Sequence, residues 1–217
     1  MALRDIFKFR DSPESESSKP FVEHLEESRS QLVAARDAAT TTLRGWDFPH
    51  TDRDDGSFFA DGIQSLTHWA VHHEAFRLHR SGMFIWRKLH QEDFEDERFQ
   101  GTLIFESLIW TYTEIWTFAS RLLGQLMESG DARVKITLTG LSGRLLKPSS
   151  PSVSVWPGRT AQEDSLTQEH VMSLGELRAD HNEYAARDAI DLLELFQAPV
   201  DPGVVRRWQE RLLKREL

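Results

Sequence analysis

The most regular run of apolar positions in the chain lies between Leu103 and Met127. Apolar residues recur there every three or four positions, which is the spacing of one face of an α-helix. Further apolar residues beside this stripe widen it to about half of the helix circumference, more than a surface helix usually carries. The pattern therefore predicts a long helix wrapped by the rest of the fold, with Glu106, Glu114 and Arg121 on its polar face. The positions of the main stripe are Ile104, Leu108, Tyr112, Ile115, Ala119, Leu122 and Leu126.

Alternation of apolar and polar residues predicts strands on both sides of this helix. Before it, two alternating runs, from about His73 to Arg80 and from about Met83 to His90, flank Ser81-Gly82 and indicate a β-hairpin. A single helix from His68 to Arg80 is the competing interpretation. After the long helix, alternation from Val134 to Thr139 predicts a half-buried strand.

The remaining segments add one strand and three helices to this pattern. Another strand is predicted within residues 166–173, and residues 21–43 form an amphipathic helix. Asp180 and Glu183 resemble a capping box at the start of a helix, and Asp201-Pro202 is typical of the start of the last one. The expected fold class is α+β, with a small, mostly antiparallel sheet packed by the long central helix and the C-terminal helices.

Composition sets the domain organisation and excludes several classes of protein. The expected divisions are a disordered lead at 1–20, the amphipathic helix at 21–45, and an α+β domain at 55–217. The chain has 217 residues, a net charge of −9 and no cysteine, so disulfide scaffolds, thiolate catalysis and cysteine-ligated zinc are excluded. No stretch is apolar for long enough to span a membrane and no signal peptide is present, so we expect a cytoplasmic protein without a membrane partner.

Four histidines between positions 68 and 79 are the candidate metal ligands. On a helix, His68 and His72 would share a face, whereas on a strand His73 and His79 would share a side. The spacing supplies no third ligand and no HExxH motif. Surface and sheet-edge histidines are the simpler interpretation, and we expect no cofactor.

Basic residues give the candidate contacts to nucleic acid. Arg144 follows Gly140 and Gly143, a pair that could cradle a phosphate but that a tight turn explains more simply. The last helix carries further arginines, which a solvated polar face explains more simply than a contact to nucleic acid. Those arginines are Arg206, Arg207 and Arg211.

Apolar side chains outside the expected core give the candidate contacts to a protein partner. Ile6, Phe7 and Phe9 cluster in the polar lead, where they suit a short docking peptide or a frayed terminus. Trp110 lies opposite the main stripe of the long helix, and Trp208 lies on the last helix. Tryptophan is enriched at protein interfaces, although secondary packing surfaces would also use it.

Several runs together resemble a known family. The runs RLHRSGMFIWRKLHQEDF, TEIWTFASRLL and VKITLTGLSGRLL, with a later helix ending in ELF, are similar to the C-terminal region of bacterial ATP-binding or DNA-binding proteins of the Schlafen/AlbA type. The resemblance covers residues 76–217 and lacks the AlbA-like part. It implies a domain that works beside a nucleic-acid-linked module, and it transfers no catalytic residue.

These observations favour a non-enzymatic protein-binding or scaffold subunit of a bacterial complex, linked to nucleic acid or phage defence, with a protein partner or a second copy. No catalytic set is recognisable in the chain. One alternative is a metal-dependent hydrolase or nuclease that uses the histidines from His68 to His79. The other is direct binding of nucleic acid through the basic last helix.

Overall fold

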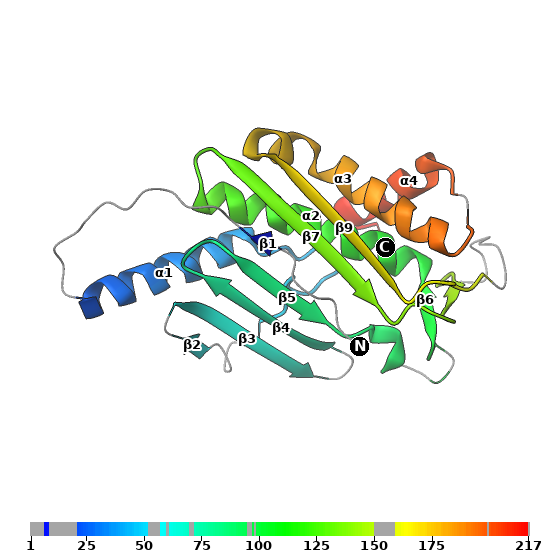
Figure 1. Cartoon of the computed structure of the whole chain (residues 1–217), viewed down its shortest axis with the longest axis horizontal. Coiled ribbons are helices and arrows are strands. Elements are labelled where there is room, and N and C mark those ends of the chain that lie inside the picture. The colour runs from blue at the N-terminus through cyan, green and yellow to red at the C-terminus, as the bar shows by residue number, and fades with distance from the viewer. Residues whose placement is uncertain are drawn as a thin grey trace.

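The computed structural model describes residues 7–8, 21–51, 57–59, 61–69, 72–94, 97, 99–149, 159–198 and 200–216. It has an α+β fold, as the sequence predicts, with strands in one layer and helices behind them (Figure 1). The helices are α1 (Phe21–Ala39), α2 (Phe105–Leu126), α3 (Leu174–Leu195) and α4 (Pro202–Leu213). The strands are β1 (Phe7–Lys8), β2 (Ser57–Phe59), β3 (Gly62–Trp69), β4 (His72–His79), β5 (Phe84–Lys88), β6 (Thr102–Ile104), β7 (Asp131–Thr139), β8 (Leu145–Lys147) and β9 (Ser165–Ser173).

Three groups of strands make up the layer. One antiparallel sheet has the order β2-β3-β4-β5, another has the order β1-β7-β9, and β6 pairs with β8 in parallel. The predicted hairpin is confirmed as β4 and β5, so the helical interpretation of this segment is wrong. The predicted strands after α2 are confirmed as β7 and β9. The sequence did not predict β3, which pairs with β4 along its whole length.

The four-stranded sheet turns its large apolar side chains toward the helices. Alternation places Phe76 of β4 and both Phe84 and Trp86 of β5 on this inner face, where they are almost fully buried. The Phe84 ring lies 4.9 Å from the ring of Phe118 on α2. Contacts of this kind hold α2 against the sheet, because a sheet with one apolar face must bury it against another layer.

The long helix α2 confirms the predicted helix and is more enclosed than predicted. Every residue from 112 to 120 is buried, because the sheets, α1, α3 and α4 surround the helix. The expected polar face therefore does not exist: Glu106 and Glu114 are fully buried, and Arg121 alone is exposed. Among the described residues, no helix is both long enough and apolar enough to cross a membrane.

Of the two predicted starts of the C-terminal helices, the start of α4 is confirmed and the start of α3 is wrong. Asp201 caps α4 as expected, and its side chain accepts a hydrogen bond from the Gly203 backbone N–H at 2.8 Å. The capping box predicted at Asp180 and Glu183 is wrong, because α3 begins earlier. Ser173 is its N-cap and accepts a hydrogen bond from the Glu176 N–H at 3.1 Å, so β9 runs directly into the helix.

Candidate functional site

A cluster of charged side chains lies between the inner face of the four-stranded sheet and α2. The loop after α1 folds back on itself, with two backbone hydrogen bonds between Thr41 and Phe48 at 3.1 and 2.7 Å. This loop delivers Arg44 to α2, where its Nε donates to Glu114 at 2.9 Å and its Nη2 donates to Thr111 at 2.9 Å. The ion pair of Arg44 and Glu114 is almost completely enclosed, with side-chain exposures of 4% and 1%.

Glu74 is the second buried carboxylate of this cluster. It accepts hydrogen bonds from the Trp86 indole at 2.6 Å and from the His50 backbone N–H at 2.9 Å, and the His50 ring lies against it. Burial alone would raise the pKa of Glu74. The His50 and Trp86 hydrogen bonds and the positive charge of Lys88 outweigh burial and hold this pKa below its usual range. Glu74 is therefore a permanent negative charge at neutral pH.

An aromatic layer covers Glu74 on the solvent side. The His72 ring lies 4.2 Å from the His50 ring and 5.5 Å from the ring of Trp46, which is 36% exposed. Burial, followed by the charge of His50, lowers the pKa of His72 to about 4. His72 is therefore neutral near pH 7, and a neutral imidazole is compatible with burial beside the rings of His50 and Trp46.

Lys88 lies directly opposite Glu74 in the antiparallel register of β4 and β5. It is partly buried, and it forms no hydrogen bond or ion pair with any residue in the described part of the chain. Burial, followed by the positive charge of Arg44, lowers the pKa of Lys88. The sequence held a signal for this placement, because Lys88 continues the inward alternation of Phe84 and Trp86, but strand periodicity alone assigns no role to a lysine.

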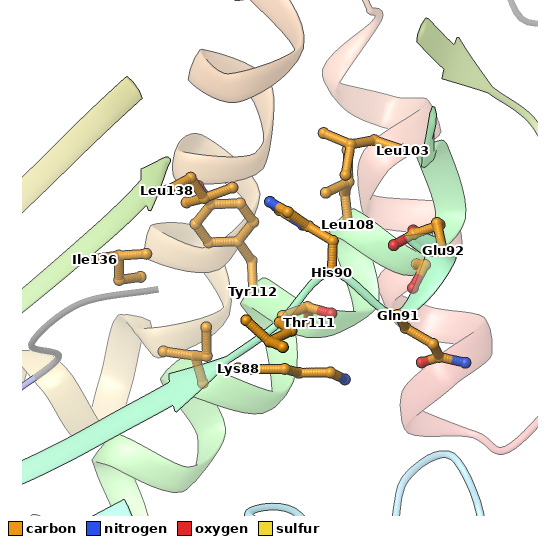
Figure 2. Close-up of a pocket in the computed structure, with 13 residues that line it drawn as sticks. Lys88, His90, Gln91, Glu92, Leu103, Leu108, Thr111, Tyr112, Ile136 and Leu138 are labelled. Atoms are coloured by element: carbon orange, nitrogen blue, oxygen red, sulfur yellow. The ribbon is translucent and has the colours of Figure 1, made fainter. Parts of the chain in front are cut away.

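Lys88 and Tyr112 line a small cavity that opens beside the N-terminal half of α2 (Figure 2). Its apolar wall comes from α2 and β7, and its polar rim comes from the segment that follows β5. His90 stands at this rim, and its Nε2 lies 3.3 Å from the Thr139 carbonyl oxygen. Burial, followed by the charge of Arg144, lowers the pKa of His90 to about 4. The cavity holds about 50 Å³, far below the ~300–1,000 Å³ of a pocket for a drug-sized ligand.

Arg144, a predicted contact to nucleic acid, is bound within the fold. Its guanidinium forms two hydrogen bonds to Asp93, at 2.8 and 2.5 Å, and donates to the carbonyl oxygen of Gly140 at 2.8 Å. Gly140 and Gly143 both have positive φ values, 71° and 75°, as the tight turn requires. Only 8% of Arg144 is exposed, so the geometry gives no support to a phosphate contact at this residue.

A second buried polar network connects α3 with β9 and α2. The Asp188 carboxylate is fully buried, accepts a hydrogen bond from the Trp116 indole at 2.9 Å, and lies 2.8 Å from His170 Nε2. Gln168 donates to the Asp188 carbonyl at 2.9 Å and accepts from the Tyr112 hydroxyl at 2.6 Å. The network gives the polar side chains of Tyr112, Gln168 and Asp188 hydrogen-bond partners inside the protein, and it links α3 to β9 and to α2.

The structure brings two of the four candidate metal ligands together and places the other two elsewhere. His68 and His73 face each other across β3 and β4 on the outer side of the sheet, with their Nδ1 atoms 2.6 Å apart. His72 points to the inner side, and the ring of His79 lies 3.1 Å from Asp61 at the other end of β4. Within the described ranges, no three histidine, cysteine or acidic side chains could hold a metal ion together. The alternative of a metal-dependent hydrolase therefore gains no support.

Trp110 and Trp208 pack against each other between α2 and α4, with ring centroids 6.1 Å apart. Arg211, another predicted contact to nucleic acid, lies over the Trp208 ring at 4.4 Å. Of the other two arginines on this helix, Arg206 forms an exposed ion pair with Glu183 at 2.8 Å, and Arg207 is exposed.

The apolar cluster of the lead is described only in part. Phe7 belongs to β1 and pairs with Val134 of β7, so its backbone extends a sheet. Ile6 and Phe9 lie outside the described residues, as does most of the lead predicted at 1–20. The docking peptide expected from this cluster therefore stays a prediction from the sequence.

The outer face of the four-stranded sheet carries a hollow that is lined in part by apolar side chains. Register places Leu66, Ala75 and Arg87 in one row across β3, β4 and β5, and it places Gln64, Arg77 and Ile85 in the next row. These rows line a hollow of about 690 Å³. Leu66 lines this hollow from β3 and is 63% exposed.

Comparison with known proteins gave no further information. No family model, no curated protein and no solved structure matches this chain. The resemblance to the Schlafen/AlbA type accordingly stays a prediction from the sequence.

Proposed function

We propose that this protein is a non-enzymatic binding subunit that takes up a segment of a partner protein on the outer face of β3, β4 and β5. The observation that carries the proposal is Leu66, which is 63% exposed in a hollow of about 690 Å³. Ala75 and Ile85, both partly buried, line the same hollow, and apolar patches with a polar rim are characteristic of protein-binding sites.

The chemistry of the face favours a partner that combines apolar and acidic residues. Leu66, Ala75 and Ile85 offer apolar contacts. The exposed residues Arg77, whose Nε donates to Gln64 at 2.9 Å, and Arg87 lie in the same two rows. Carboxylates are the natural partners of guanidinium groups, which they bind through two parallel hydrogen bonds. A peptide with leucine or isoleucine beside aspartate or glutamate fits both features.

The interior supports a binding role more than a catalytic one. The buried charges are mostly paired, as in Arg44 with Glu114 and Arg144 with Asp93, and the cavity beside Lys88 is too small for an ordinary substrate. A role within a bacterial complex, linked to nucleic acid or phage defence, belongs to this proposal through the family resemblance alone.

Selection from a displayed library of short random peptides against the full chain tests the proposal. We expect enrichment of peptides that mix acidic and large apolar residues, and loss of their binding in Leu66→Asp. The matched control is Val171→Asp, because Val171 is 62% exposed on the outer face of the other sheet. Peptides that bind Leu66→Asp as tightly as the unchanged protein, or a selection that enriches nothing, would overturn the proposal.

A further inference from the structure

We propose that Lys88 is a covalent attachment site for small aldehydes, which it binds as an imine inside the cavity shown in Figure 2. This inference does not depend on the proposed binding function, because the cavity lies on the inner side of the sheet and the binding face lies on the outer side. It rests on where the lysine is held, on the size of the cavity, and on the groups that face the amine.

The position of Lys88 is the first part of the argument. The side chain lines the cavity together with Leu108 and Tyr112, and it forms no hydrogen bond or ion pair within the described part of the chain. Burial removes part of the hydration of an ammonium group, and the pKa of a lysine shifts readily when the side chain is buried. Neutral amines, unlike ammonium groups, are nucleophiles toward carbonyl carbons.

The charged groups around Lys88 come from four elements. Arg44 approaches from the loop after α1, Glu74 from β4, Glu92 from the turn after β5, and Glu114 from α2. The three carboxylates raise the pKa of Lys88, but burial and the Arg44 charge prevail and lower it. A larger share of this amine is therefore neutral near pH 7 than of a lysine in open solvent.

The cavity limits the size of the aldehyde. Its volume of about 50 Å³ is several times the ~10–15 Å³ that one water molecule needs. Roughly three or four atoms larger than hydrogen fit this space, which corresponds to an aldehyde of two or three carbons. Figure 2 shows the Lys88 nitrogen on the side of the cavity where Gln91 lies, away from Ile136 and Leu138, so the aldehyde carbon would be held on that side.

The reaction needs no partner beyond the aldehyde. The lone pair of Lys88 Nζ forms a bond to the carbonyl carbon while the π electrons of the carbonyl move to its oxygen. The resulting carbinolamine then loses that oxygen as water, which carries away the two protons of the amine, and a carbon–nitrogen double bond remains. Atoms and electrons balance without an oxidant or a reductant.

Trapping of the imine in the folded chain tests the inference. The protein is incubated at pH 7 with acetaldehyde and cyanoborohydride, and ethylation of each lysine is measured by peptide mass spectrometry. The absence of cysteine removes competing thiols. We expect Lys88 to be ethylated several-fold faster than Lys135, which is exposed on β7. Equal or slower labelling of Lys88 would overturn the inference.

Two controls separate the cavity from a general difference in reactivity. In guanidinium chloride the chain unfolds, and the preference for Lys88 over Lys135 should disappear because both amines are then solvated alike. Benzaldehyde is too large for the cavity, so in the folded protein it should favour Lys135. A preference for Lys88 that survives unfolding, or that is as large with benzaldehyde, would contradict a role for the cavity.

Discussion

Arg44 and Glu114, 70 residues apart in the chain, form an ion pair that is almost entirely removed from solvent. The pair joins the loop after α1 to the middle of α2, and Thr111 accepts a further hydrogen bond from the same guanidinium. The other carboxylate oxygen, Glu114 Oε1, is buried without a hydrogen-bond donor from any described residue. Arg44 is therefore the hydrogen-bonded counter-ion of Glu114, and the charge of Lys88 interacts with the same carboxylate.

Removal of one partner from this pair should be costly. We expect Arg44→Met to lower the free energy of unfolding by about 3–5 kcal/mol, since it leaves a buried carboxylate without its cation. The double variant Arg44→Met with Glu114→Met should recover most of this loss, because a buried ion pair often contributes little more than well-packed apolar side chains. Urea denaturation of the single and double variants measures both effects.

The exposed pair of Arg206 and Glu183 is the control for that experiment. Its side chains are 55% and 57% exposed, so Arg206→Met should cost about 1 kcal/mol or less. A comparable cost at the two pairs would show that the enclosure of Arg44 has no energetic consequence.

Stability should fall as the solution is acidified from about pH 6.5 to about pH 4, in part because of His90. Burial lowers the pKa of His90 to about 4 in the folded protein, whereas the unfolded chain has the ordinary value near 6.5. Between these values the unfolded state binds more protons, so acid favours unfolding. The contribution of His90 is fully present above pH 6.5 and is lost as the pH falls to about 4, and it amounts to at most about 3 kcal/mol.

His90→Gln removes this titration while keeping a polar side chain at the rim of the cavity. The decrease in the free energy of unfolding between pH 7 and pH 4 should be smaller in the variant than in the unchanged protein, by about 1–3 kcal/mol. The same decrease in both proteins would show that His90 takes up its proton without unfolding.

The N-cap of α3 offers a local test of the corrected helix start. Ser173→Ala removes the hydrogen bond to the Glu176 N–H, and it should cost about 1 kcal/mol of folding free energy. Ser165→Ala, at the exposed opposite end of the same strand, should cost much less. A larger loss at Ser165 than at Ser173 in thermal or urea unfolding would contradict the assigned cap.

Sequence predicted the elements whose patterns are local. The apolar stripe of α2, the alternation of β7 and the Asp201-Pro202 start of α4 each need only a few neighbouring residues to be recognised. The start of α3 was predicted wrongly because β9 leads into it without a loop, so no turn residue separates strand from helix. The parallel pair of β6 and β8 has only three residues in each strand, too few for any periodicity.

The candidate sites could be predicted only in part, because they depend on pairing over long distances. The sequence predicted that Glu114 lies on a solvated face of the helix, because no local pattern indicates that Arg44 pairs with it. The pairing of His68 with His73, and the row that exposes Leu66, both require β3, which the sequence did not reveal. The sequence left open whether Trp110 and Trp208 contact a partner or cover secondary packing surfaces, and their mutual packing follows from the approach of α4 to α2.

The proposed binding face can be located directly by methyl NMR of the full chain during titration with a selected acidic and apolar peptide. Leu66 and Ile85 lie on that face, whereas Val171 is equally open to solvent on the other sheet. We expect the methyl signals of Leu66 and Ile85 to shift with the peptide while those of Val171 stay in place. Shifts at Val171 with unchanged signals from Leu66 and Ile85 would contradict the account.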